Sequence, residues 1–148
     1  MRKFLSGIGV MLMLAAMAVA APKPTRSTQD QPFPGTLRNA RYVYVASYDG
    51  DQFTPDLLLE DRNAIAAVQD SIQKWGKLSV VYRPADADII LLVQSRPSED
   101  VVAVYDAHMP GGQYLWRAMG RDGLQTGETP LMTQFQKGFE GVQRKSGK

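Results

Sequence analysis

Five large apolar residues follow one another without interruption from Ile89 to Val93, and they constrain the fold of this chain more than any other stretch. The run is short for a helix, and Pro84 and Pro97 bound it. A strand with one solvent-exposed face alternates apolar and polar residues, whereas an unbroken apolar run is typical of a strand covered on both faces. The stretch 87–95 is therefore predicted to be the central strand of a sheet.

The length and composition of the chain favour one domain and exclude several chemistries. With 148 residues and 44% hydrophobic content, it is long enough for one modest core and too short for two. The absence of cysteine excludes disulfides, thiolate metal sites, a cysteine nucleophile and a lipidated amino-terminal cysteine. The chain has 17 Lys and Arg residues and 15 Asp and Glu residues, and without Arg2 and Lys3 the two numbers are equal. We therefore expect no binding to nucleic acid or to anionic lipid surfaces.

Residues 1–20 have the features of a secretory signal peptide. Arg2 and Lys3 precede an apolar run that closes on the small residues of 18–20. Cleavage is predicted between Ala20 and Ala21, because a cut one residue later would leave a proline directly after the break. The alternative, an uncleaved anchor, needs about 20 apolar residues. The protein is thus expected to be exported, to the periplasm or outside the cell, without a stable membrane anchor after cleavage.

Two regions follow the signal peptide. Residues 21–37 are rich in proline and polar residues, a composition typical of a flexible linker. An alternative is a proline-rich ligand for an aromatic groove, for which 32–34 is the candidate segment. Residues 38–145 are predicted to form a single α/β domain.

The domain is predicted to contain five strands and two main helices. Alternating or apolar runs bounded by turn residues predict strands at 41–48, 78–82, 87–95, 101–106 and 113–119. The last two should form a hairpin around the breakers of 108–112, and the strand–helix–strand order at the start should give a parallel pair. The fold class is α/β, of the α+β kind: one two-layer domain with a mixed sheet of about five strands.

Both helices are predicted to begin at a Thr-Pro pair. In the first, Thr54 is the expected cap, with Asp61 as a possible later start, and Gly76 is the expected end. The second opens at Thr129-Pro130. Helical spacing predicts the buried stripes Leu58, Ile65, Val68, Ile72 and Trp75 in the first helix and Leu131, Phe135, Phe139 and Val142 in the second.

A calcium-loop spacing at Asp49, Asp51 and Glu60 is interpreted as a solvated turn. Phe53 stands where an oxygen ligand is needed, and Thr54 where the loop requires glycine. No metal ion and no cofactor are predicted.

Two carboxylate groupings are weighed as catalytic candidates. His108, the only histidine, lies two residues from Asp106 in the predicted hairpin turn, and no motif places a nucleophile beside them. Asp86 and Asp88 are a possible acid–base pair, but they also suit the solvated start of a very apolar strand. The preferred interpretation is structural, so no catalytic residue is predicted. A carboxylate-dependent hydrolase is kept as an alternative function.

The succession of short motifs along the chain resembles small α/β domains of bacterial envelope proteins. The motifs are Trp75-Gly76, the Ala-Asp steps of 85–88 before the apolar strand, Tyr105-Asp106 and Leu115-Trp116. The TolB amino-terminal domain and CsgG-like periplasmic domains look similar over about 42–142. Unlike many envelope relatives, this chain has no lipidated cysteine, propeller or membrane-spanning partner domain. The resemblance implies an envelope α/β fold and leaves the function open.

The central strand also predicts an interaction surface. Ile89, Leu91 and Val93 point to one side of it, while Ile90 and Leu92 point to the other, so two helices on one face cannot cover both sets. The expected function is a noncatalytic envelope or secreted binding module, with a protein partner or self-association on the apolar sheet face. Helices divided between the two faces, or the linker lying across the second, would remove this surface. A subunit of an obligate oligomer is a further alternative.

Overall fold

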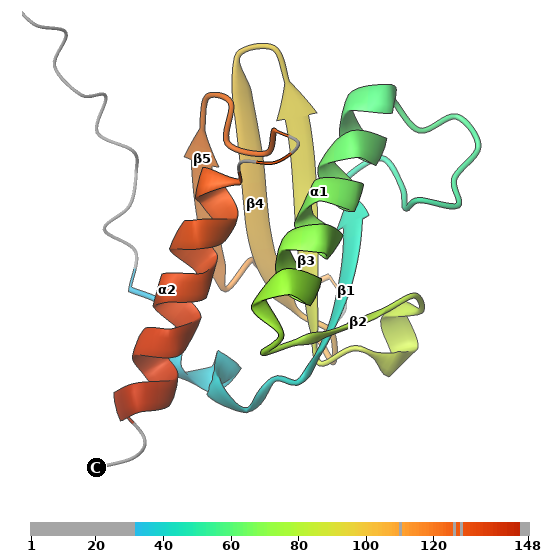
Figure 1. The fold of residues 1–148 in the computed structure, drawn as a ribbon. Coiled ribbons are helices and arrows are strands. Elements are labelled where there is room, and N and C mark those ends of the chain that lie inside the picture. The colour runs from blue at the N-terminus through green and yellow to red at the C-terminus, as the bar shows by residue number, and fades with distance from the viewer. Residues whose placement is uncertain (1–31, 110, 126, 128, 146–148) are drawn as a thin grey trace, which may run out of the picture.

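The computed structural model describes residues 32–109, 111–125, 127 and 129–145, which form a five-stranded mixed sheet with two main helices and two short 3₁₀ helices (Figure 1). In chain order the elements are η1 (Gly35–Asn39), β1 (Tyr42–Ser47), α1 (Leu59–Trp75), β2 (Ser79–Val81), η2 (Pro84–Asp86), β3 (Ile89–Arg96), β4 (Glu99–Asp106), β5 (Trp116–Gly120) and α2 (Pro130–Lys145). The predicted fold class, an α+β domain with five strands and two main helices, is confirmed.

The strands lie in the order β2-β1-β3-β4-β5. β1 pairs in parallel with both β2 and β3, whereas β4 is antiparallel to β3 and β5. The strand around Ile89–Val93 is thus central, as predicted. The β3–β4 turn is tighter than the turn expected at 98–100, because only Pro97 and Ser98 separate the two strands.

Both main helices cover one face of the sheet, and the core lies between them and that face (Figure 1). Ile89, Leu91 and Val93 are at most 2% exposed, packed with α1 and α2 residues in one cluster. Ile90 and Leu92 point the other way, are only partly buried, and belong to a separate small cluster around Tyr44. The parity of the central strand was therefore predicted correctly.

The α1 helix begins later than the Thr54 cap predicts, although its buried face was largely foreseen. The Thr54 hydroxyl is bonded to Asp51 instead, and the residue before the helix, Leu58, makes no side-chain cap bond. Leu58 is also 49% exposed, so it does not belong to the buried stripe. Gly76 ends the helix in the left-handed conformation, as predicted.

The α2 helix is held by an aromatic cluster. Phe135 and Phe139, both fully buried, pack against Trp75 and against Phe33 from the segment before η1. Leu37 in η1 is also buried, at 3% exposed. The structure thus differs from the expected linker at its last residues, because an aromatic and an aliphatic side chain there have a core to pack against.

No helix in the described ranges is long and apolar enough to span a membrane. The predicted signal peptide and the cleavage site between Ala20 and Ala21 lie outside the described residues.

Candidate functional site

The face of the sheet opposite the helices carries no described helix. Strand register identifies the side chains that share this face, because residues paired across neighbouring strands point to the same side. We call this surface the open face, and its members in the middle of the sheet are Tyr44, Ala46, Val81, Ile90, Leu92, Gln94, Val101, Ala103, Tyr105, Arg117 and Met119. At the strand ends, Tyr42, Ser79, Arg96 and Glu99 share the same side.

Two tyrosine rings cover the middle of the open face. Ala46 and Ala103 are 6% and 0% exposed although no helix lies over them. Register places Tyr105 on one side of the row that contains these alanines, and Tyr48, which follows β1, on the other. The hydroxyl oxygens of Tyr48 and Tyr105 are nevertheless only 3.4 Å apart. The two tyrosine side chains therefore meet across the row that contains Ala46, Leu92 and Ala103.

The hydroxyl group of Tyr48 is affected by its surroundings on this face. Burial, followed by the hydrogen bond to Tyr105, raises the pKa of Tyr48 to about 12, while nearby Arg117 acts in the opposite direction. Tyr48 remains 45% exposed, and Tyr114 beside it 42% exposed. The phenol groups can thus accept or donate hydrogen bonds to a partner while their rings offer apolar surface.

Arg117 is the charged residue in the middle of the open face, since Arg96 and Glu99 lie at the strand ends. Its Nε is buried and has no hydrogen-bond partner among the described residues. A buried guanidinium N–H without an acceptor is costly, and a carboxylate is the acceptor that suits it best. The open face therefore combines a largely apolar, tyrosine-rich surface with a partly exposed guanidinium group, to which a carboxylate of a partner can bind.

Tyr44 connects the open face to the loop that follows β1. Its hydroxyl donates to Oδ2 of Asp51 at 2.8 Å. This bond is the largest cause of the lowered pKa of Asp51, and burial is the largest cause of the raised pKa of Tyr44, which is about 12. The loop is therefore fastened to the edge of the open face.

The structure brings three of the four catalytic candidates to one small cleft of about 180 Å³, lined in part by Asp88, Asp106 and His108. The His108 Nε2 lies 3.9 Å from Oδ1 of Asp88, and its side chain is 71% exposed in the turn. Asp106 accepts a hydrogen bond from the backbone N–H of His108. Asp86 lies apart in an ion pair with Arg83. The sequence neighbours Asp86 and Asp88 do not form a carboxylate pair.

Asp88 has a structural role in this cleft. Its Oδ2 accepts hydrogen bonds from the backbone N–H groups of Arg41 and Tyr42, at 2.8 and 3.0 Å. The Arg41 bond is the largest cause of the lowered pKa of Asp88. A carboxyl with a lowered pKa is a poor general acid at neutral pH. The exposed turn and the engaged carboxylate do not support the hydrolase alternative.

Two of the three acidic residues of the calcium-like spacing are used for other contacts. Asp49 forms an ion pair with Arg96 at 2.9 Å, and Asp51 binds the Tyr44 hydroxyl. Within the described part of the chain, no group of three or more Asp, Glu or His side chains is placed to hold a metal ion.

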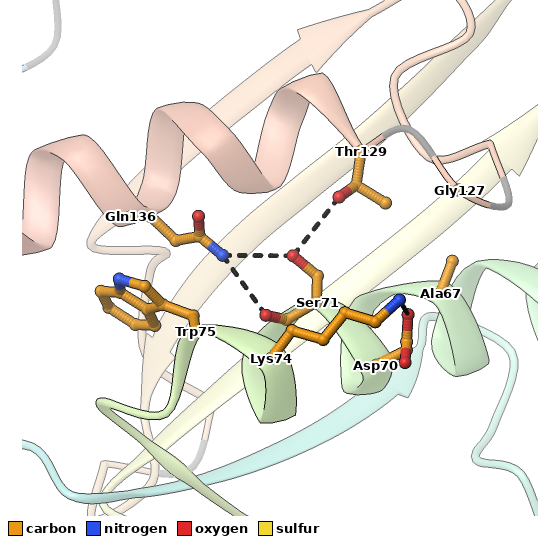
Figure 2. Close-up of a pocket in the computed structure, with 8 residues that line it drawn as sticks. All are labelled: Ala67, Asp70, Ser71, Lys74, Trp75, Gly127, Thr129 and Gln136. Carbon is orange, nitrogen blue, oxygen red and sulfur yellow. Dashed lines mark hydrogen bonds and ion pairs between the residues drawn. The ribbon is translucent and has the colours of Figure 1, made fainter.

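A groove of about 320 Å³ separates α1 from α2 (Figure 2). Inside it, Gln136 Nε2 donates to the Ser71 hydroxyl oxygen at 3.1 Å, and the Thr129 hydroxyl donates to the same oxygen at 3.3 Å. On the rim, Lys74 pairs with Asp70 at 2.6 Å, and Figure 2 shows this pair turned away from Gln136. Because these polar groups bind one another, they help to hold the two helices together.

The sequence did not lead us to predict a buried polar network around Asp61. Asp61 is fully buried in the first turn of α1, and its Oδ1 accepts from the Ser95 backbone N–H and from Arg96. Ser95 in turn donates to Asp100, which accepts from the backbone N–H of Leu124. One feature of the sequence could have indicated this network: Asp61 lies four residues before Ile65, and therefore on the buried face of the helix.

Comparison with known protein families gives no match, and no curated protein matches the sequence. Two solved structures are weakly similar, a PelC dodecamer from Paraburkholderia phytofirmans and a variant of it with a single substitution. The first is 16% identical with a TM-score of 0.39, covering 74% of this chain and 89% of that chain. The variant is also 16% identical, with a TM-score of 0.38, covering 72% and 88%. Similarity at this level identifies neither a family nor a function for this chain.

Proposed function

We propose that this chain is a noncatalytic binding module, exported to the bacterial envelope or secreted, and that its open face binds a protein partner. One observation carries the proposal: both helices cover the same side of the sheet, so no helix among the described residues covers the other side, where Ile90, Leu92, Tyr105 and Met119 are only partly buried. Sheets in soluble domains usually bury such a surface, and an exposed one often marks an interaction site.

The composition of the open face matches that of protein interfaces. Tyrosine, methionine and arginine are enriched in interfaces, where tyrosine and arginine often contribute most of the binding energy. Tyr105, Arg117 and Met119 are partly exposed members of the open face, with Tyr48 and Tyr114 at its border. The partner that fits is a protein surface that is mainly apolar and presents one carboxylate to Arg117.

The described start of the chain packs on the helix side of the sheet. Phe33 lies against Trp116, Phe135 and Phe139. Phe33 therefore lies on the side away from the open face. The resemblance to small envelope domains and the predicted signal peptide support the envelope as the location in this proposal.

Site-specific cross-linking in the producing cells tests the proposed function. A photoreactive residue replaces Tyr114 at the border of the open face, and the matched control carries it at Lys137 on the exposed side of α2. We expect one discrete cross-linked product from position 114, reduced about tenfold or more by Arg117→Glu, a loss expected for a truncated interface anchor. A product of twice the chain mass would mean that the partner is a second copy. Equal products from both positions, or none from 114, would overturn the proposal.

A further inference from the structure

The two ends of the domain differ in their exposed charged groups. Arg38 and Arg41 precede β1, and Lys77 follows α1, which returns to the same end of the sheet, where Asp86 and Asp88 also lie. At the other end of β1, Asp56 lies in the loop between β1 and α1, and Glu60 lies in the first turn of α1. The 17 residues of α1 separate these ends by roughly 25 Å at 1.5 Å per residue.

The basic end contains a cleft. Its volume is about 550 Å³, and it is lined by Arg38, Asn39, Ala40, Arg41, Tyr42, Lys77, Ser79 and Gln143. Lys77 is paired with Glu140 at 3.3 Å. Arg38 and Arg41 are exposed and form no ion pair with any described residue. Tyr42, at 48% exposed, gives the cleft an aromatic wall, and the Asp88 carboxylate lies beside Arg41 and offsets part of its charge.

The acidic end projects a loop that displays apolar side chains. Phe53 is 66% exposed, Leu58 49% and Leu59 66%. The carboxylates of Asp56 and Glu60 flank them, are exposed, and have no ion-pair partner in the described ranges. We call residues 50–60 the acidic knob.

The acidic knob is held in one conformation by its own contacts. Arg62 donates to the backbone carbonyl oxygens of Gln52, Thr54 and Pro55 at 3.2 to 3.4 Å. Gly50 has a φ of 146°, and a Cβ there would collide with the Thr54 side chain. A loop ordered before binding loses less conformational entropy on association.

We propose that the acidic knob of one copy binds in the basic cleft of a second copy, so that the domains associate head to tail. Phe53, Leu58 and Leu59 would lie against the cleft wall, with Asp56 and Glu60 facing Arg38 and Arg41 of the partner copy. The charges are complementary, because carboxylates and guanidinium groups that form no ion pair with any described residue would face each other. The cleft volume also lies within the range typical of binding pockets, about 300 to 1,000 Å³.

A lipid surface fits the knob less well than a second copy. Anionic headgroups would repel Asp56 and Glu60, whereas the basic cleft of the same chain attracts them. Head-to-tail contacts use two different patches, so they form chains or close into rings. The basic cleft shares Tyr42 and Ser79 with the open face, but Tyr105 and Arg117 do not line the cleft, so they stay available to the partner of the proposed function.

Sedimentation of the mature protein over a concentration series tests the inference. We expect the weight-average mass to rise with concentration at about 0.01 M salt, and to fall toward that of the monomer at about 1 M, where the Debye length shrinks from about 30 Å to about 3 Å. A protein that stays monomeric at low salt throughout the series would overturn the proposal. Association that strengthens with salt would point to an apolar contact elsewhere and would also overturn it.

Charge reversals identify the two surfaces. Arg38→Glu and Asp56→Arg should each weaken self-association about tenfold or more, since like charges then face each other. An equimolar mixture of the two variants should regain association, because the reversed ends complement each other. Lys137→Glu is the matched control on α2 and should associate like the native chain. Melting curves of each variant establish that it is folded.

Two outcomes separate this inference from the proposed function. Phe53→Ser should weaken self-association and leave the cross-link from position 114 intact. Arg117→Glu should weaken the cross-link and leave self-association intact. If the two single reversals associate like the native chain, or if their mixture stays monomeric, the knob and cleft do not meet. If inorganic phosphate binds in the cleft but the protein does not self-associate, the ligand of the cleft is a free anion and the proposal is overturned.

Discussion

Single carboxylates hold the backbone of this domain together where the sequence suggested chemistry or solvent contact. Asp88 binds two backbone N–H groups at the start of β1, and Asp61 binds the end of β3 from inside α1. Each of these two carboxylates therefore links segments of the chain that are distant in the sequence. At the residue scale, therefore, the acidic residues of this chain contribute to stability through backbone contacts.

The first prediction concerns pH. The pKa of Asp88 is lowered on folding, mainly by the Arg41 N–H bond, so its stabilisation is complete above the unfolded value near 3.8 and is lost as pH falls through the lower folded value. Asp88→Asn should reduce this acid-dependent loss in urea unfolding at stepped pH. Because the Asp88 side chain is 37% exposed, the cost at neutral pH should stay below about 1 kcal/mol. An unchanged acid profile would contradict the assignment, and Asp86→Asn serves as the comparison for removing one charge nearby.

Trp116 and His108 should respond very differently to truncation. Trp116 is 7% exposed and packs against Phe33 and Phe135, as the strand position predicted. Trp116→Ala should therefore destabilise the domain by about 3 to 5 kcal/mol, the usual cost of removing a buried aromatic side chain. His108→Ala should leave the denaturation midpoint almost unchanged. Similar losses in the two variants would show that this placement is wrong.

Most elements could be predicted from the sequence because their apolar spacing is regular. The stripe Leu131, Phe135 and Phe139 predicted α2, and these residues are buried. The start of α1 was less predictable, because Thr54 bonds within its own loop and Asp61 forms tertiary contacts. The packing of Phe33 was also missed, since a proline-rich segment gives no local sign that an aromatic cluster lies nearby.

Two glycines of α2 allow a matched test at the scale of this element. A Cβ at Gly138 would collide with the Phe33 ring, whereas nothing lies within 4 Å of a Cβ at Gly141. Gly141→Ala should stabilise the domain by about 0.5 to 1 kcal/mol through helix propensity. Gly138→Ala should instead destabilise it by about 1 to 3 kcal/mol, because the Phe33 segment must move. Denaturation midpoints that shift in the same direction would contradict the packing of Phe33 on α2.

At the scale of the whole molecule, the sequence indicated that one sheet face lacks cover but could not indicate which groups would gather there. Parity along β3 was sufficient to separate Ile90 and Leu92 from the buried set. The meeting of Tyr48 with Tyr105 depends on strand order, which a single sequence does not encode locally. The charge difference between the two ends was hidden for the same reason, because the overall composition is close to neutral.

The last prediction concerns export of the whole chain. Cleavage is expected between Ala20 and Ala21, about twelve residues before Phe33, the first side chain seen to pack on the domain. An extended segment of that length spans up to roughly 40 Å, so the folded domain need not block the peptidase. The intact mass of the protein recovered from the envelope or the medium should therefore correspond to a chain that begins at Ala21. A mass that retains Met1, or one that begins well inside the proline-rich segment, would contradict both the cleavage site and the exported location on which the proposed function depends.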